Sequence, residues 1–351
     1  MGRGKRLTDE QCIEAWQAYQ EFQSLPKGAR RLGIPMATFQ NRIENYKTRF
    51  GDLEQAAEKA GPEFTVMALP DDDLDIDDLV ELRIKQFGKK KQYQEATKLI
   101  QVKVRLDGPI GILHFGDPHV DDDGTDLETL RKHSDLTKIE GIWGANVGDT
   151  TNNWVGRLAR LYANQSTTAA QAWKLAEWFI NRTRWLYMIG GNHDAWAGAA
   201  DPLKWIARQQ DAIYQPSECR VGLNFPNGRK VIVNARHDFA GHSQWNPAHG
   251  QMKSIQMGMR DHLAVSGHKH TSGYGVIKDA STGRICHAVQ VASYKIYDSY
   301  AKERGFRDQT LSPACMTIID PALEDDHPDM IKIFWCPEEG ADYLNFKRSK
   351  V

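Results

Sequence analysis

Hydrophobic residues in the first fifty positions return every three or four residues, which is the spacing of one face of a helix. This spacing predicts three short helices, over residues 7–22, 27–32 and 36–50. Thr8 and Gln11 form a capping pattern at the start of the first helix, and Gly33 interrupts the spacing before the third. We therefore expect a small all-α module in this part of the chain.

The pattern changes at about residue 108, where short apolar runs of strand length replace the helical spacing. Five of these runs cover residues 111–115, 141–147, 185–189, 230–235 and 262–266. A helix is predicted between the first two, over residues 126–138. Strands that alternate with helices indicate an α/β domain, and the carboxyl ends of its strands are where such a sheet places its site.

The composition indicates a folded protein without a general affinity for polyanions. The 351 residues include 45 Lys+Arg and 46 Asp+Glu, so the formal net charge is −1, whereas a protein that coats nucleic acid carries a large positive excess. No run of 18 uncharged apolar residues predicts a membrane span, and no signal-peptide core follows the basic start. Five scattered cysteines favour reduced thiols. We expect a cytoplasmic protein with no membrane partner.

The near-zero net charge conceals strongly charged segments. Residues 1–50 carry nine basic and five acidic side chains, residues 51–82 carry one and eleven, and residues 83–105 carry eight and one. This alternation predicts a helical module at 1–50, a charged linker at 51–105 with a helix near 79–87, and a main domain at 106–351. The acidic run lacks the turn glycine and the late glutamate of a calcium loop, so we interpret it as a solvated linker.

Residues 28–43 resemble a helix-turn-helix, in which Ala29 permits close helix crossing and Gly33 makes the turn. The resemblance implies that Gln40 and Asn41 face the major groove of DNA and that basic side chains meet phosphates. These basic side chains are Arg30, Arg31, Arg42 and Lys47. A three-helix module that docks another protein would have the same core pattern, so both interpretations stay open, with DNA as the expected partner.

Side chains that bind metal ions follow all five predicted strands. Asp117 and His119 follow the first, and both can reach one ion because alternate residues of an extended segment point the same way. The others are Asp149 after the second strand, Asn192, His193 and Asp194 after the third, His237 after the fourth, and His268 and His270 after the fifth. Each motif alone is weak, but their common placement at strand ends predicts a metal site.

This series of Asp-x-His, Gly-Asp, Gly-Asn-His-Asp, a single His and Gly-His-x-His resembles the calcineurin-like metallophosphoesterases over roughly residues 108–340. Phage and prophage proteins with a helix-turn-helix ahead of such a domain are the nearest match. The resemblance implies a four-layer αββα sandwich, whose second sheet would come from the runs 275–277, 286–291, 316–319 and 330–335. A phage origin would place the protein in the cytoplasm of a bacterial host cell.

The resemblance further implies a site with two divalent metal ions. Asp117, His119 and His270 would hold one ion, Asn192, His237 and His268 would hold the other, and Asp149 would bridge both. Manganese is the expected metal, and this set of oxygen and imidazole donors also suits iron or zinc. His193 would protonate the leaving group, and Asp194 would hold the His193 ring by a hydrogen bond.

Departures from the family pattern bear on the substrate. The phosphoprotein phosphatases of this family continue after Gly-Asp with an Asp-Arg-Gly whose arginine grips the phosphate, whereas this chain continues with Thr150 and Thr151. The chain also has Asp194 where those phosphatases have Glu. Both differences favour a phosphodiesterase or nuclease, with DNA as the expected substrate, over a protein phosphatase.

Three further polar and aromatic residues follow His237 within ten positions, namely His242, Gln244 and Trp245. They are candidate substrate contacts, with Trp245 as a stacking surface, or else part of a turn that packs its aromatic side chains.

Two other functions remain open: a phosphomonoesterase for a small metabolite, and a DNA-binding or assembly protein that retains the fold. The intact ligand set favours an enzyme, since a protein that only binds has no physical need for every ligand. The sequence indicates no particular protein partner.

Overall fold

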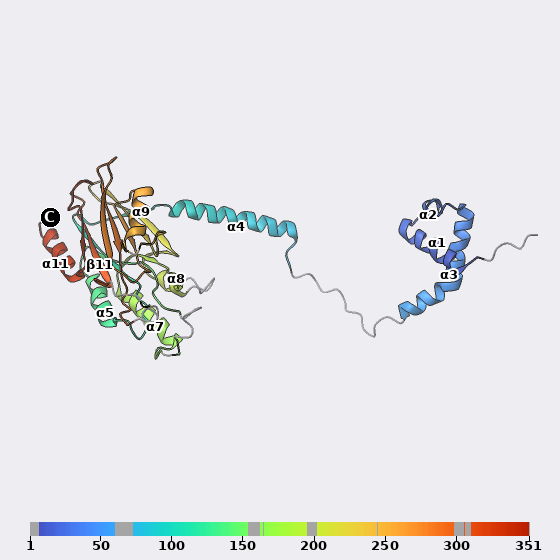
Figure 1. Ribbon diagram of the computed structural model, residues 1–351, viewed down its shortest axis with the longest axis horizontal. Helices are drawn as coiled ribbons and strands as arrows, with labels where there is room; N and C mark the ends of the chain where they lie inside the picture. Colours follow the sequence, from blue (N-terminus) through green and yellow to red (C-terminus); the bar gives the residue numbers. More distant parts are fainter. Residues whose placement is uncertain are drawn as a thin grey trace, which may run out of the picture. The chain divides into compact units, whose positions relative to one another are not determined.

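A computed structural model gives the structure of the chain (Figure 1). It describes residues 7–59, 73–153, 162–163, 165–194, 202–243, 245–297, 305 and 310–350, with the backbone alone for residues 52–59. The chain divides into two compact units, Met1–Glu81 and Leu82–Val351. Each unit is described by itself.

Within residues 7–59, the first unit contains the helices α1 (Asp9–Phe22), α2 (Leu25–Arg31) and α3 (Met36–Lys59). The expected capping pattern is present, because the Gln11 backbone N–H donates to the Thr8 side chain and the Gln11 side chain accepts from the Thr8 backbone. A small core joins the helices through Ala15, Ala18, Ala29, Phe39 and Ile43. Burial of these side chains holds the three helices together.

Two details of this unit differ from the expectation. Ala29 is buried, but the closest helix approach is at Gly28, where an added Cβ would lie 2.3 Å from Cζ of Phe39. Gly33 does turn the chain as expected, in the left-handed region with φ of 65°. Helix α3 continues through Gly51 to Lys59 instead of ending at residue 50, because most residues after Gly51 are good helix formers.

The predicted linker at 51–105 is partly regular structure. It includes the end of α3, the helix α4 (Ile76–Thr97) and the strand β1 (Ile100–Lys103). Strand β1 pairs in parallel with β6 (Glu218–Asn224), so the boundary predicted at residue 106 separated a strand from its own sheet. The helix expected near 79–87 is longer than predicted. It begins at Ile76, because Asp77 and Asp78 stabilise a helix N-terminus, and it continues through Gly88 into helix-forming residues such as Lys89 and Gln92.

Two six-stranded mixed sheets form the second unit. The first has the order β12 (Ile331–Phe334), β11 (Ala314–Ile319), β2 (Ile110–Phe115), β3 (Ile142–Asn146), β4 (Trp185–Ile189) and β5 (Ile213–Gln215). The second has the order β1, β6, β7 (Lys230–Arg236), β8 (Leu263–Ser266), β10 (Ile285–Gln290) and β9 (Gly273–Lys278). Strands β2 to β5 are parallel to one another, as are β7, β8 and β10.

The sheets pack face to face around a shared apolar core that includes Tyr187, Val221 and Val233. Helices cover the outer face of the first sheet, namely α5 (Leu127–Leu136), α7 (Ala169–Arg182), α8 (Pro202–Ala207) and α11 (Pro337–Arg348). Helix α9 (His249–Met257) packs on the outer face of the second sheet. The described residues of this unit thus form an α/β sandwich, with helices outside two facing sheets (Figure 1).

The distribution of strands between the sheets differs in part from the prediction. Strands β9 and β10 do join the second sheet, but β11 and β12 lie in the first, where β11 pairs antiparallel with β2. The fourth and fifth predicted strands, β7 and β8, belong to the second sheet, and β1, β5 and β6 were not predicted. An apolar run shows that a strand is buried but does not choose its sheet, because both sheets face one core.

Within the described ranges, no helix combines the length and the apolar character needed to cross a membrane. The five cysteines are free thiols, of which Cys336 alone is exposed.

Candidate metal centre

The carboxyl ends of five strands bring the predicted ligands together. Strands β2, β3 and β4 are parallel neighbours in the first sheet, and β7 and β8 are parallel neighbours in the second. Their five following turns therefore meet at one edge of the sandwich. The seven predicted ligands form two linked groups of donor atoms at this edge.

His237 is the centre of the first group. Its Nε2 lies 3.2 Å from Oδ2 of Asp149, 2.8 Å from Oδ1 of Asn192 and 3.1 Å from Nδ1 of His268. Donor atoms of Asp149, His237 and His268 all lie within 4.8 Å of one another, so these three residues could hold a metal ion. His237 Nδ1 donates to the Val147 carbonyl at 2.9 Å, which directs Nε2 toward the group.

Asp117, His119 and His270 form the second group. His119 Nε2 lies 3.2 Å from His270 Nε2, which in turn lies 3.5 Å from Oδ2 of Asp117. The two groups are linked, since Asp117 Oδ1 is 3.8 Å from His237 Nδ1 and Asp117 Oδ2 accepts the His268 backbone N–H. All seven predicted ligands therefore lie in one continuous cluster.

The backbone at the site adopts uncommon conformations. Four predicted ligands have positive φ, at 41° for His119, 47° for Asp149, 70° for His268 and 51° for His270. A non-glycine residue in this region costs about 1–3 kcal/mol, and such residues cluster at functional sites. Asp and His tolerate the conformation better than most residues do.

Glycines allow the ligands to approach the backbone. An added Cβ at Gly191 would lie 2.0 Å from Oδ1 of Asp149, and one at Gly267 would lie 2.4 Å from Oδ1 of Asp117. The same atom at Gly148 would lie 2.2 Å from Nδ1 of His237. The Gly in each of the three motifs is thus a steric requirement of the ligand cluster.

Burial and close charges shift the pKa values of the cluster. Burial raises the pKa of Asp117 well above its usual range. Burial alone would lower the pKa of His237, but the neighbouring Asp149 and Asp117 raise it to about 10. Burial disfavours the charged form of Asp149 also, yet His237 and the other imidazoles hold the pKa of Asp149 below its usual range. Positive charge is therefore strongly favoured between these two carboxylates.

The unpartnered atoms and the donor types of the cluster are those expected at a cation site. Oδ1 of Asp117 is fully buried and has no hydrogen-bond partner, and Nδ1 of His119 is also buried without one. A buried, unpartnered carboxylate oxygen is costly unless a cation satisfies it. The donor set of carboxylate, imidazole and amide oxygen atoms also lacks thiolate, which suits manganese, iron or zinc. The residues present therefore fit a metal.

His193 lies beside the cluster, but the residue that holds its ring differs from the prediction. Its Nε2 is 3.8 Å from Oδ2 of Asp149, and its Nδ1 donates to the Asn152 carbonyl at 2.8 Å. The expected hydrogen bond from Asp194 is wrong, because that carboxylate accepts the backbone N–H groups of Gly191, Thr150 and Thr151. Asp194 thus fixes two site loops, and burial raises its pKa to about 7.

The partners of Asn152 were not anticipated from the sequence. Its backbone N–H donates to Oδ1 of Asp121 at 2.6 Å, and its side-chain amide donates to Oδ2 of Asp122 at 3.0 Å. Lys295 forms a buried ion pair with the same Oδ2 of Asp122. The sequence gives no signal that Asn152 holds His193, because this hydrogen bond uses the Asn152 backbone carbonyl, a group that any residue type provides.

The candidate substrate contacts lie on an exposed segment after β7. Lys269 connects the start of this segment to the site by contacts with Asp238 and the Gly241 carbonyl. His242 and Trp245 are exposed, the latter at 93%, so Trp245 does not pack in a turn. Gln244 lies outside the described residues. Substrate contact by this segment remains a prediction.

The predicted DNA contacts lie on the surface of the first unit. One of the six, Arg42, is half-buried. The other five are exposed, namely Arg30, Arg31, Gln40, Asn41 and Lys47. Lys47 Nζ lies 5.5 Å from the centre of the Trp16 ring. Their exposure is compatible with contact to a phosphate backbone, and DNA binding stays a prediction.

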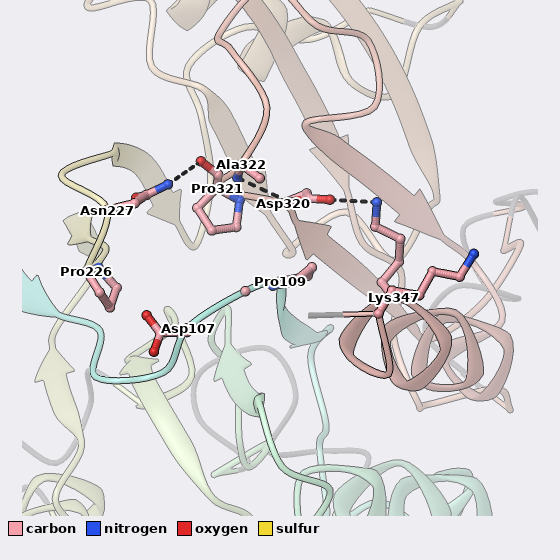
Figure 2. Close-up of a pocket in the computed structure, with 10 residues that line it drawn as sticks. Asp107, Pro109, Pro226, Asn227, Asp320, Pro321, Ala322 and Lys347 are labelled. Atoms are coloured by element: carbon pink, nitrogen blue, oxygen red, sulfur yellow. Dashed lines mark hydrogen bonds and ion pairs between the residues drawn. The ribbon is translucent and has the colours of Figure 1, made fainter.

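A pocket of about 320 Å³ lies at the opposite end of β2 from Asp117 (Figure 2). Pro109 immediately precedes β2, and the pocket also includes Asn227, Asp320 and Lys347. An ion pair of 2.7 Å joins Lys347 to Asp320. None of the predicted ligands lines this pocket, so it is separate from the metal centre.

Comparisons with known proteins assign no family. No protein-family model matches the chain, and no curated protein matches it. Among solved structures, the protein of unknown function AQ665 from Aquifex aeolicus is 16% identical, with 46% of this chain and 80% of that chain covered and a TM-score of 0.26. Likeness at this level carries no argument about function, so the resemblance drawn from the strand-end motifs remains a prediction.

Proposed function

We propose that the second unit is a calcineurin-like, dimetal-dependent phosphoesterase that hydrolyses phosphodiester bonds, with DNA as its substrate. One observation carries the proposal: all seven predicted ligands, from five separate strand ends, lie in a single cluster around Asp149 and Asp117. The layered α/β sandwich supports it further, since helices flank two facing sheets as the family resemblance implies.

The two groups of donors suggest how two ions would be held. Asn192, His237 and His268 would bind one, and Asp117, His119 and His270 would bind the other, with Asp149 between them. The chemistry that two bound divalent ions supply is activation of a water nucleophile and neutralisation of charge on the phosphoryl oxygens. We expect manganese, with iron or zinc also compatible with the donors.

His193 is the proposed general acid for the leaving group. Because Nδ1 donates to the Asn152 carbonyl, Nε2 is the nitrogen directed toward the cluster, and in the imidazolium form of the ring Nε2 carries the proton that passes to the leaving oxygen. Asn152 is in turn held by Asp121 and Asp122. A fixed ring places the acid where an ester oxygen would leave.

Phosphodiester substrates are favoured by the residues after Asp149. Thr150 and Thr151 donate backbone N–H groups to Asp194, and both residues are buried. In the sequence these two threonines stand where the phosphoprotein phosphatases continue with the Asp-Arg-Gly whose arginine grips a phosphomonoester. The exposed basic side chains of the first unit give a means of attaching the enzyme to DNA.

Metal content and turnover of purified full-length protein test the proposal. Asp149→Asn should lower the bound manganese and abolish hydrolysis of bis-p-nitrophenyl phosphate, because Asp149 is the proposed bridge between the two groups. His193→Ala should retain the metal and lose about 10²–10⁴-fold in turnover, the usual contribution of a general acid. His327→Ala is the matched control, since His327 is exposed and far along the chain from the cluster. Normal turnover by His193→Ala would remove the assigned role.

A panel of substrates separates the alternatives. The diester should be hydrolysed faster than p-nitrophenyl phosphate, and labelled single- or double-stranded DNA should be cut. Preference for the monoester would indicate a metabolite phosphatase, and no hydrolysis of any substrate would indicate a binding or assembly protein. DNA affinity of the full-length protein should fall steeply with salt and fall further in Arg30→Ala and Arg31→Ala.

A further inference from the structure

Helix α4 has a continuous apolar face on its surface. Ile76, Leu79, Val80, Ile84 and Phe87 are between 38% and 70% exposed, and none of the α4 side chains is buried. At about 100° per residue, these five side chains lie within an arc of about 140° around the helix. An exposed apolar stripe of this kind marks an interaction surface.

The charges of α4 and of the residues just before it divide into an acidic block followed by a basic block. Residues 73–82 carry five acidic side chains and no basic one: Asp73, Asp75, Asp77, Asp78 and Glu81. Residues 83–91 carry five basic side chains and no acidic one: Arg83, Lys85, Lys89, Lys90 and Lys91. The boundary between the blocks lies in the middle of the apolar face.

Both patterns are approximately symmetric about Leu82, although in an antiparallel pair Leu79 of one copy would then lie level with Lys85 of the other. When two copies of α4 run antiparallel and cross at Leu82, Val80 of one copy lies level with Ile84 of the other. Ile76 then lies within one residue of the level of Phe87. The same alignment sets each acidic block beside the basic block of the other copy, whereas a parallel alignment would set like charges side by side.

We propose that α4 is a dimerisation helix, and that two copies of this chain pair antiparallel through the apolar face of α4 and cross at the level of Leu82. The contact is isologous, with the same surface used by both copies, as a twofold axis requires. Burial of the apolar stripe stabilises the pair, and the charge blocks fix its direction. The proposal does not depend on the enzymatic function.

Sedimentation of the full-length protein over a range of concentrations tests the proposal. We expect a reversible monomer–dimer equilibrium. Phe87→Glu should weaken the dimer by at least about 100-fold, because each copy loses one buried aromatic side chain and places a charge in the contact. A chain that stays monomeric at every concentration would overturn the proposal, also where its apolar face is covered by another part of the same copy. Formation of trimers would overturn the proposal as well.

Leu82→Glu is the matched control. Leu82 lies at the level of the crossing point, but its direction is about 130° around the helix from the centre of the apolar face and about 60° from Leu79 at the edge of that face. Leucine and glutamate have similar helix propensities, so circular dichroism should show equal helix content in both variants. We expect Leu82→Glu to dimerise as the unmodified chain does. An equal loss in both variants would contradict the proposed face.

Disulfide trapping tests the direction of pairing. In a Cys336→Ser background the other four cysteines are buried. A mixture of Ile76→Cys and Phe87→Cys chains should form a cross-linked dimer under mild oxidation, because antiparallel pairing brings the two positions to the same level. Either variant alone should form little disulfide-linked dimer. Cross-linking of Ile76→Cys with itself would show parallel pairing and refute the proposal.

Discussion

Buried histidines should control the acid stability of the sandwich. Burial lowers the pKa of His287 to about 4, that of His262 to about 4 and that of His114 to about 3. His287 is 4% exposed, and its Nδ1 lies 2.7 Å from the Tyr274 hydroxyl. The folded chain therefore holds a neutral imidazole at this position well below neutral pH.

The sign of the effect follows from proton binding. Below about pH 6.5 the unfolded chain binds a proton at His287, whereas the folded chain does so only near pH 4. Because the unfolded state binds more protons in this interval, the free energy of unfolding falls as the pH falls. One proton corresponds to about 1.4 kcal/mol per pH unit, so His287 contributes about 3 kcal/mol that is present above pH 6.5 and lost near pH 4.

Urea unfolding of His287→Gln between pH 7 and pH 4.5 measures this contribution. At pH 7 the variant should be less stable, because it loses the packing and the Tyr274 contact of the imidazole. Its deficit should shrink by about 2–3 kcal/mol toward the acid end, since glutamine takes up no proton. His327→Gln changes an exposed histidine and is the matched control. A deficit that stays constant with pH would refute the reasoning.

Three substitutions test the packing. Gly267→Ala should displace Asp117 and lower manganese binding at least tenfold by metal titration, since the new Cβ would lie 2.4 Å from Oδ1 of Asp117; unchanged metal binding would contradict the close approach. Gly28→Ala should destabilise the first unit by about 1–3 kcal/mol in thermal unfolding, through the clash with Phe39. Phe179→Ala should lower the free energy of unfolding in urea by about 3–5 kcal/mol, because the ring is fully buried.

The sequence predicted the site better than it predicted the sheets. Metal-type residues placed just after buried strands gather wherever parallel strands share an edge, so the cluster around Asp149 needed no knowledge of strand order. Strand order depends on contacts distant in sequence, such as the pairing of β11 with β2, and hydrophobic runs do not encode it. Strand β5 has only three residues, too few for a pattern.

The orientation of His193 was predictable only in part. The Gly-Asn-His-Asp motif predicted that His193 lies close to the metal-ligand candidates, and its ring does lie beside Asp149. The predicted hydrogen-bond partner of the His193 ring was wrong. Asp194 was expected because it is the next residue in the sequence, whereas the ring donates to the carbonyl of Asn152, in the loop after β3. A backbone acceptor leaves no trace in residue type, so contacts of this class require a structure.

The cluster is arranged at the expense of stability, which argues for a function. Four ligands hold a left-handed backbone at about 1–3 kcal/mol each, and Asp117 is buried with an unpartnered oxygen. Three glycines leave space that the ligands occupy, although glycine raises the entropy of the unfolded chain. Several unfavourable features gathered at one edge of the sandwich are typical of a functional site. A bound cation would relieve the cost of the buried, unpartnered oxygen of Asp117.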